Sequence, residues 1–188
     1  MQHFQPVFSH LPVLETDRLL LRPMRMSDAR DLFAYASDPE VSRHVLWETH
    51  RCLGDSRQML RQVKWQYRRG LPSSYAITLR ESGRMIGTIG FMWVNIEHHS
   101  AEVGYSLARP YWNQGLTTEA LKKLLAFGFD TLRLNRIEAQ HETDNPASGR
   151  VMAHCGMRYE GTMRQRIMNK GKYVDVKVYA ILRGDPRP

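Results

Sequence analysis

The run from Tyr111 to Ala120 constrains the fold more than any other part of the sequence. It follows a strand-like stretch and opens a helix-like one, with a single glycine at the junction. A glycine turn that leads into a helix leaves several backbone N–H groups without a partner inside the helix. Those donors and the positive end of the helix dipole suit a phosphate or pyrophosphate. The alternative is an ordinary helix start capped by Thr117 or Thr118, with Glu119 complementing the dipole.

The bulk composition indicates one soluble globular domain. The chain has 188 residues, of which 42% are hydrophobic and 24% charged, and this is enough for a sizeable core. The net charge of +8 serves either solubility or attraction to an anionic partner. Five basic residues recur at helical spacing, and we expect them to form a solvated helix face. They are Arg57, Arg61, Lys64, Arg68 and Arg69.

Several functional classes are disfavoured. There is no apolar run long enough to span a bilayer and no signal-peptide pattern at the N-terminus. Cys52 and Cys155 are the only cysteines, which favours a reducing cytoplasm over a disulfide framework. No histidines follow a metal-binding spacing, so we expect no metal site. For His98, His99, His141 and His154 we expect surface roles.

Hydrophobic periodicity and turn residues predict an α+β (mixed α/β) domain with one central sheet. We expect residues 1–12 to be a flexible leader and residues 13–184 to be the domain. The predicted strands are 14–24, 75–79, 85–94, 101–108, 137–141, 159–168 and 173–182. The predicted helices begin at Ser27-Asp28, after Asp38-Pro39, and at Asp55, Leu116 and Pro146.

Two further segments carry candidate chemistry. Gly104 lies within a predicted strand, where glycine indicates a bulge or a close backbone approach. Glu102, on the same strand, is either an exposed carboxylate or a general base. Asn145 precedes a helix, and its side chain either caps that helix or faces a ligand. Ser148 lies in the first turn of the same helix.

Taken together, these segments resemble the GCN5-related N-acetyltransferases, in the branch of the bacterial ribosomal-protein N-terminal acetyltransferases. The resemblance covers nearly the whole chain, in the same order and spacing. The segments that carry it are Leu14–Pro23, Ile86–Gly90, Glu102–Tyr105, Tyr111–Gly115, Thr118–Ala120, Asn145–Ser148 and Cys155–Met157.

The resemblance implies a mostly antiparallel sheet, splayed at the strand that contains Gly104, and acetyl-coenzyme A as co-substrate. Backbone amides of Gln114, Gly115, Leu116, Thr117 and Thr118 would hold the pyrophosphate. Tyr105, Ser106 and Leu107 would pair with the pantetheine arm, and Asn145 and Ser148 would contact it near the thiol.

Three positions depart from the family pattern. Thr117 stands where a smaller residue is usual, and Asn113 stands where a glycine is usual. The tyrosine acid of many relatives is replaced by Val151-Met152. We therefore expect Ser148 to serve the leaving thiolate, with Glu102 as the base and backbone N–H groups near Val103 stabilising the oxyanion.

The function predicted is acetyl transfer to a primary amine by direct attack in a ternary complex, most simply a protein N-terminal α-amine. Acceptors such as a polyamine, an amino acid or an antibiotic remain alternatives, as does a non-catalytic basic binding module. We disfavour a nucleic-acid partner and a membrane, and a homodimer is compatible with the sequence. An acetyl-enzyme on Cys155 is a minor alternative. The first helices, residues 44–53 and the final hairpin are expected to build the acceptor pocket.

Overall fold

An eight-stranded sheet forms the centre of the computed structural model, which describes residues 5–187. The strand order across the sheet is β1-β2-β3-β4-β5-β6-β8-β7. The strands are β1 (Leu14–Glu15), β2 (Leu19–Pro23), β3 (Ser74–Leu79), β4 (Met85–Asn95), β5 (Ser100–Leu107), β6 (Arg136–Glu142), β7 (Arg158–Asn169) and β8 (Lys172–Leu182). The α-helices are α1 (Gln5–Ser9), α2 (Ala29–Ala36), α3 (Pro39–Ser42), α4 (Leu53–Arg69), α5 (Leu116–Asp130) and α6 (Pro146–His154). Two 3₁₀ turns are η1 (Met26–Asp28) and η2 (Arg109–Tyr111).

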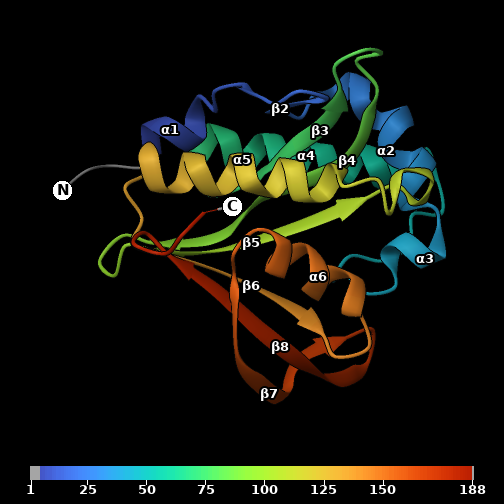
Figure 1. Ribbon diagram of the computed structural model, residues 1–188. Helices are drawn as coiled ribbons and strands as arrows, with labels where there is room; N and C mark the ends of the chain where they lie inside the picture. The colour runs from blue at the N-terminus through green and yellow to red at the C-terminus, as the bar shows by residue number, and fades with distance from the viewer. Residues whose placement is uncertain (1–4, 188) are drawn as a thin grey trace.

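The parallel pair β5–β6 opens into a V. Every other neighbouring pair is antiparallel, which confirms the predicted mostly antiparallel sheet. Residues 100–102 of β5 pair with residues 136–138 of β6. Beyond Glu102, β5 continues beside β4 alone and β6 beside β8 alone (Figure 1). The edge of β5 from Val103 onward therefore lacks a neighbouring strand, and its backbone polar groups are free to bind something else. The predicted splay is confirmed.

The irregularity expected at Gly104 lies instead on the neighbouring strand. Gly104 pairs in register with Gly90, and the register shifts at Met92, between Phe91 and Trp93. A Cβ on Gly104 would approach the Met92 sulfur to 3.1 Å, so a larger residue at position 104 would crowd the bulged Met92 side chain. β5 itself keeps the alternation of side chains between the two faces of the sheet.

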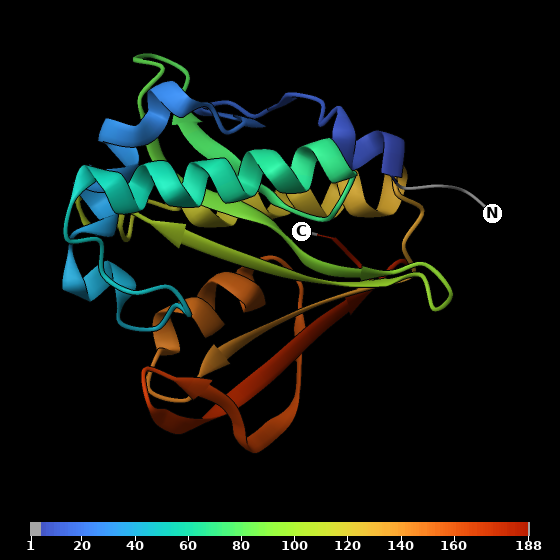
Figure 2. The ribbon, with the colours of Figure 1, turned by 180° about the vertical axis from the view of Figure 1, so that it is seen from behind.

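The helices form one layer on each face of the upper arm, β1–β5. Helix α5 packs on one face against a cluster that includes Leu21, Ile89 and Val103. Helices α2 and α4 pack on the other, against a cluster that includes Ala76. Figure 1 shows the α5 side and Figure 2 the α4 side. Helix α6 lies beside α5 and covers β6, β8 and β7 on that same side.

The N-terminal segment differs from the expected flexible leader. Residues 1–4 lie outside the described part of the chain. The residues after them form α1, which packs on α4, and the side chains of Phe8 and Leu11 are buried in the main core. The Phe8 ring meets Phe91 edge to face. These apolar contacts hold residues 7–12 against the domain.

The single strand predicted over residues 14–24 is two strands. β1 and β2 form a short antiparallel hairpin, with Leu14 opposite Leu21. The turn between them is closed by Thr16, whose N–H donates to the Leu19 carbonyl and whose hydroxyl oxygen accepts from the Leu19 N–H. The turn contacts the start of α5, because Thr16 and Arg18 both hydrogen-bond to Glu119.

Candidate functional site

The start of α5 is a set of backbone donors with no side-chain cap. Gly115 is the N-cap residue in the left-handed region (φ 74°), and no side chain caps the helix. The first N–H to bond within the helix belongs to Glu119, which donates to the Gly115 carbonyl at 3.0 Å. The N–H groups of Leu116, Thr117 and Thr118 therefore have no acceptor in the helix. The expectation that Thr117 or Thr118 caps the helix is wrong.

The loop before α5 is shaped for a ligand to approach its backbone. A Cβ built on Gly115 would meet only Arg18 Nη2, at 3.6 Å, so the glycine leaves open space beside the N–H groups. Asn113 adopts a positive φ of 59°, which asparagine tolerates better than most residues. The departure at Asn113 thus preserves the backbone conformation that a glycine would give.

Arg18 and Glu119 anchor the start of α5 to the β1–β2 turn. Glu119 Oε1 accepts from Thr16 Oγ1 at 2.6 Å and from the Arg18 N–H at 2.9 Å, and Glu119 Oε2 accepts from Arg18 Nε at 2.7 Å. Burial disfavours the charged carboxylate, but these hydrogen bonds outweigh it and lower the pKa of Glu119. Arg18 Nη1 also donates to the Gln114 carbonyl at 3.0 Å.

This anchor places a guanidinium beside the free donors of α5. No periodicity in the sequence points to Arg18, because its partner Glu119 lies 101 residues away. Glu119 therefore does more than complement the helix dipole.

The unpaired edge of β5 presents backbone rather than side chains at Ser106 and Leu107. Ser106 is buried and its hydroxyl lies 3.0 Å from Thr88 Oγ1, while Leu107 belongs to the main core. Trp112 Nε1 donates to the Leu107 carbonyl at 2.7 Å, which fixes the loop that leads to α5.

Tyr105 reaches across the splay to the first turn of α6. Its hydroxyl lies 2.9 Å from Ser148 Oγ and 3.1 Å from the Ser148 carbonyl oxygen, so its single proton can be donated to either. Burial raises the pKa of Tyr105 well above its ordinary value, although the hydrogen bond with Ser148 acts in the other direction. The phenol therefore keeps its proton at neutral pH.

Asn145 caps α6. Its Oδ1 accepts from the Ser148 N–H at 3.4 Å, so the capping role is confirmed. The capping bond uses only the amide oxygen, and the –NH₂ group of Asn145 is left as a donor at the same helix end as Ser148.

Glu102 lies on the opposite face of β5 from Tyr105, at the last paired position before the splay. Two neutral donors hold its carboxylate. Trp93 Nε1 donates to Oε2 at 2.7 Å and Gln140 Nε2 donates to Oε1 at 2.9 Å. Because Gln140 lies on β6, the hydrogen bond crosses the V just where backbone pairing ends. Sequence reasoning named neither partner.

Glu102 lines a pocket of about 460 Å³ on the open face of the lower arm, β6–β8–β7. Glu138, Glu160 and Arg136 also line this pocket, and Glu138 is the register partner of Glu102 on β6. Arg136 is held between the other two, with Nη2 at 2.8 Å from Glu138 and 2.6 Å from Glu160.

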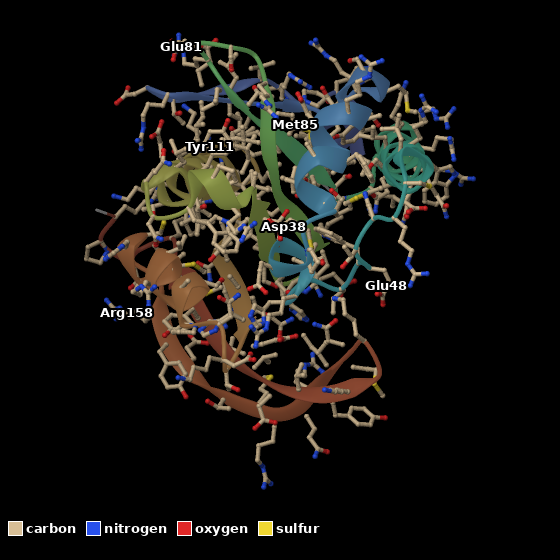
Figure 3. All side chains as sticks on the ribbon, turned by 90° about the vertical axis from the view of Figure 1, so that its right-hand side faces the viewer. Asp38, Glu48, Glu81, Met85, Tyr111 and Arg158 are labelled. Atoms are coloured by element: carbon tan, nitrogen blue, oxygen red, sulfur yellow. The ribbon has the colours of Figure 1, made fainter. Side chains whose placement is uncertain are left out.

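The segment between α3 and α4, in which Figure 3 labels Glu48, lies at the open end of the V. His44 Nδ1 lies 2.8 Å from Glu142 Oε2, at the end of β6. Lys170, in the β7–β8 turn, donates to the carbonyls of Ser42 at 2.9 Å and Val45 at 2.6 Å. The structure thus brings residues 42–45 and the final hairpin together, as expected for an acceptor pocket.

A second, smaller pocket of about 240 Å³ lies between α2 and the end of β5 and is lined by Asp38, Met85 and Tyr111 (Figure 3). Asp38 pairs there with Arg109 at 2.8 Å. This ion pair closes its rim and does not reach the α5 donors or Glu102.

The histidines differ in part from the surface roles expected. His141 is buried beneath Gly149, where a Cβ would lie 2.7 Å from its Nε2. Its Nδ1 donates to the Glu142 carbonyl, which can only accept. Burial lowers the pKa of His141, so the ring is neutral and structural. Within the described residues, His44, Glu142 and Asp144 bring three ligand-type atoms within 4.8 Å, and His44 Nδ1 is already hydrogen-bonded to Glu142 Oε2.

Cys155 is buried at the end of α6, with its thiol donating to the Thr118 carbonyl at 3.5 Å. Burial raises the pKa of Cys155 to about 12. The thiolate is therefore scarce near neutral pH, which argues against an acetyl-enzyme on this residue. Among the helices formed by residues 5–187, none is both long and apolar enough to cross a membrane.

Comparison with known proteins gives consistent matches. The Acetyltransferase (GNAT) domain family matches residues 18–158. The chain is 35% identical over 172 residues to the uncharacterized N-acetyltransferase YoaA of Bacillus subtilis (strain 168), covering 92% of this chain and 97% of the relative. It is 34% identical over 173 residues to the uncharacterized N-acetyltransferase p20 of Bacillus licheniformis, with the same coverage.

More distant matches carry named activities. The chain is 27% identical to the [ribosomal protein uS5]-alanine N-acetyltransferase of Escherichia coli (strain K12), covering 93% of each. A GNAT-family acetyltransferase structure from Bacillus anthracis superposes with a TM-score of 0.81 at 27% identity, covering 93% of this chain and all of that one. A ribosomal L7/L12 α-N-protein acetyltransferase, solved with coenzyme A, superposes with a TM-score of 0.81 at 22% identity, covering 91% and 98%.

Proposed function

Because the chain belongs to the GNAT acetyltransferase family and is an N-acetyltransferase, we propose that it transfers the acetyl group of acetyl-coenzyme A to the N-terminal α-amine of a protein or peptide. The observation that best supports this proposal is the position of the α5 N-terminus relative to strand β5. The uncapped start of α5 lies at the end of the loop that continues from the unpaired edge of β5.

These residues fit coenzyme A. A pyrophosphate needs several backbone donors and positive charge, and Leu116, Thr117, Thr118 and Arg18 supply them. The pantetheine arm carries amides, which would pair with the backbone of Tyr105–Leu107 as an added strand pairs with a sheet edge. A distant relative's structure contains coenzyme A, which supports the same assignment.

We assign the proton donor to the Tyr105–Ser148 pair. When the amine attacks the acetyl carbon, the new C–N bond forms and the C–S bond breaks, so the sulfur needs a proton. Ser148 Oγ supplies it and is resupplied by the Tyr105 hydroxyl, 2.9 Å away, which regains a proton from water when the products leave. Asn145, at the same helix end, would orient the arm near the sulfur.

We assign the proton acceptor to Glu102. Only a neutral amine is nucleophilic, and an α-amine has a pKa of about 7.7–8.0 against about 10.4 for lysine. A carboxylate at the vertex of the V, acting directly or through water, can take the proton that the α-amine loses. Its two donors, Trp93 and Gln140, fix its direction without a competing positive charge.

The distant ribosomal-protein acetyltransferases support a protein N-terminus as the acceptor, in the cytoplasm. Small amines such as polyamines, amino acids or antibiotics are the alternative acceptors. Both cysteines are unpaired thiols, in keeping with a reducing compartment.

A thiol-release assay with acetyl-coenzyme A tests the proposal across peptides with free N-termini, polyamines and amino acids. Glu102→Gln should lower kcat by about 10²–10⁴. Glu97→Gln, which changes an exposed carboxylate in the β4–β5 turn, should not. A chain without a thermal shift in millimolar acetyl-coenzyme A would be a binding module instead. An unchanged kcat in Glu102→Gln would remove the base from this position.

A further inference from the structure

The lower arm of the sheet has one covered face and one open face. Helix α6 packs on β6, β8 and β7 from the α5 side. On the other face Glu138, Gln140 and Glu142 follow one another along β6, opposite Ala180, Val178 and Val176 of β8. The pocket at Glu102 is part of this open face, so an acceptor can reach Glu102 from the side opposite α6.

The inner end of that pocket is negative. Arg136 is the cation nearest to Glu138 and Glu160, and it is fully engaged by both. The Glu102 carboxylate, in contrast, accepts only from neutral groups, the Trp93 indole and the Gln140 amide. One carboxylate thus has no cationic partner among the described residues, and an ammonium entering the pocket would supply one.

The β7–β8 hairpin, which contributes Arg166 to the lining of the pocket, is basic when taken as a whole. The β7–β8 hairpin, residues 158–182, contains six lysines or arginines against two acidic residues, a net charge of +4. Half of the chain's net charge of +8 therefore lies in 25 residues. Arg164, Arg166 and Lys172 are exposed, form no ion pair in the described part of the chain, and Arg166 lines the pocket itself. Met163 adds apolar surface on the same hairpin.

We infer that this face binds a peptide whose free N-terminus is followed by acidic residues, an inference that rests on the proposed function. The ammonium lies against Glu102, and the acidic side chains that follow lie along the hairpin near Arg166 and Arg164. The same charge pattern disfavours the other polyions. A polyamine is repelled by the hairpin, and a nucleic acid is repelled by the carboxylates of the pocket.

Three peptides that share their first two residues and carry acidic, neutral or basic residues at positions three to eight test the inference. The acidic peptide should have a kcat/KM about tenfold above the basic one, as two or three exposed charge pairs would give. The difference should lie in KM and should shrink as salt is raised from low to high concentration.

Charge-reversal variants distinguish a local effect of the hairpin on peptide binding from a general effect of the protein's net charge. Arg166→Glu should abolish the preference for the acidic peptide by raising the KM for that peptide. Arg61→Glu, on the exposed face of α4, makes the same change in net charge and should keep the preference. Lys172→Glu is the second hairpin variant, and thermal melting checks that each variant folds.

The outcomes separate the two hypotheses. Equal kcat/KM for the acidic and basic peptides, or equal effects of Arg61→Glu and Arg166→Glu, overturns the inference and leaves the proposed function standing. Competition by an RNA oligonucleotide at moderate salt would assign the hairpin to nucleic acid and overturn it too. If no peptide is acetylated while a small amine is, the proposed function itself fails.

Discussion

Replacing Glu119 by alanine should both destabilise the protein and weaken cofactor binding. The change removes three hydrogen bonds to a carboxylate, from Thr16 Oγ1, the Arg18 N–H and Arg18 Nε. Hydrogen bonds to a charged group contribute about 1.5–3 kcal/mol each, and they are not additive. The Arg18 side chain is 51% exposed, so solvent screens its share. We expect a loss of about 2–3 kcal/mol, or about 4–12 °C in Tm for a chain of this size.

The contribution of Glu119 to the free energy of unfolding should depend on pH in a defined direction. The pKa of Glu119 is lowered in the folded state, so its contribution is present above the unfolded-state value of about 4.5. It is lost as the pH falls through the folded-state pKa. The difference in unfolding free energy between wild type and Glu119→Ala should therefore be full at pH 7 and shrink below about pH 4.5.

Urea denaturation at several pH values measures that difference, and thiol release measures the KM for acetyl-coenzyme A. KM should rise, because Arg18 and the Gln114 carbonyl lose their fixed positions, while kcat at saturation changes little. Glu15→Ala is the matched control, since Glu15 pairs with exposed Arg80 at 3.6 Å and should cost less than about 0.5 kcal/mol. Equal costs for the two variants, or a difference that persists at low pH, would refute the reasoning.

Three further substitutions have defined outcomes. Gly115→Ala places a Cβ on a left-handed residue, which should cost about 1 kcal/mol of stability and raise the KM for acetyl-coenzyme A. Gly83→Ala is the control: Gly83 has φ 68° in an open turn, so the variant should lose the same stability without a rise in KM. Gln140→Ala removes one donor from Glu102 and should lower kcat about tenfold and alter the pH–rate profile, whereas a purely structural role would leave the profile unmoved. Gly149→Ala should cost about 1–3 kcal/mol in urea denaturation, because its Cβ would meet His141 Nε2 at 2.7 Å, and a loss below about 0.5 kcal/mol would contradict this packing.

Local rules in the sequence identified most elements. Helix α4 ends where Gly70 adopts φ 63°, and α6 begins with Pro146 at its first turn, as glycine and proline preferences predict. The long strand expected over residues 14–24 failed because alternation cannot show that the chain folds back at Thr16. The burial of Phe8 was equally invisible, since it depends on Phe91, far along the chain.

The residues of the candidate site also divide into those that local sequence identifies and those that only contacts between distant residues reveal. Gly115 was identifiable because its conformation is local, and the donors that it exposes follow from helix geometry. Arg18 and Gln140 were not, because each acts on a residue 101 or 38 positions away. Such contacts depend on the strand order and on which face a side chain occupies, and the sheet fixes both only after it has formed.

Side chains along β5 alternate between the two faces of the sheet, and this alternation determines how Glu102 and Tyr105 are placed at the splay. Glu102 and Tyr105 are an odd number of residues apart on a regular strand, so their side chains leave opposite faces of the sheet. A proton acceptor and a proton donor in direct contact would hydrogen-bond to each other and not to the substrate. In the proposed mechanism they approach a thioester lying along the unpaired edge from two sides, Glu102 from the last paired position on the acceptor face and Tyr105 with Ser148 from the α6 face. A bulge in β5 would turn both groups to one side; placing it on β4, at Met92, leaves that alternation intact.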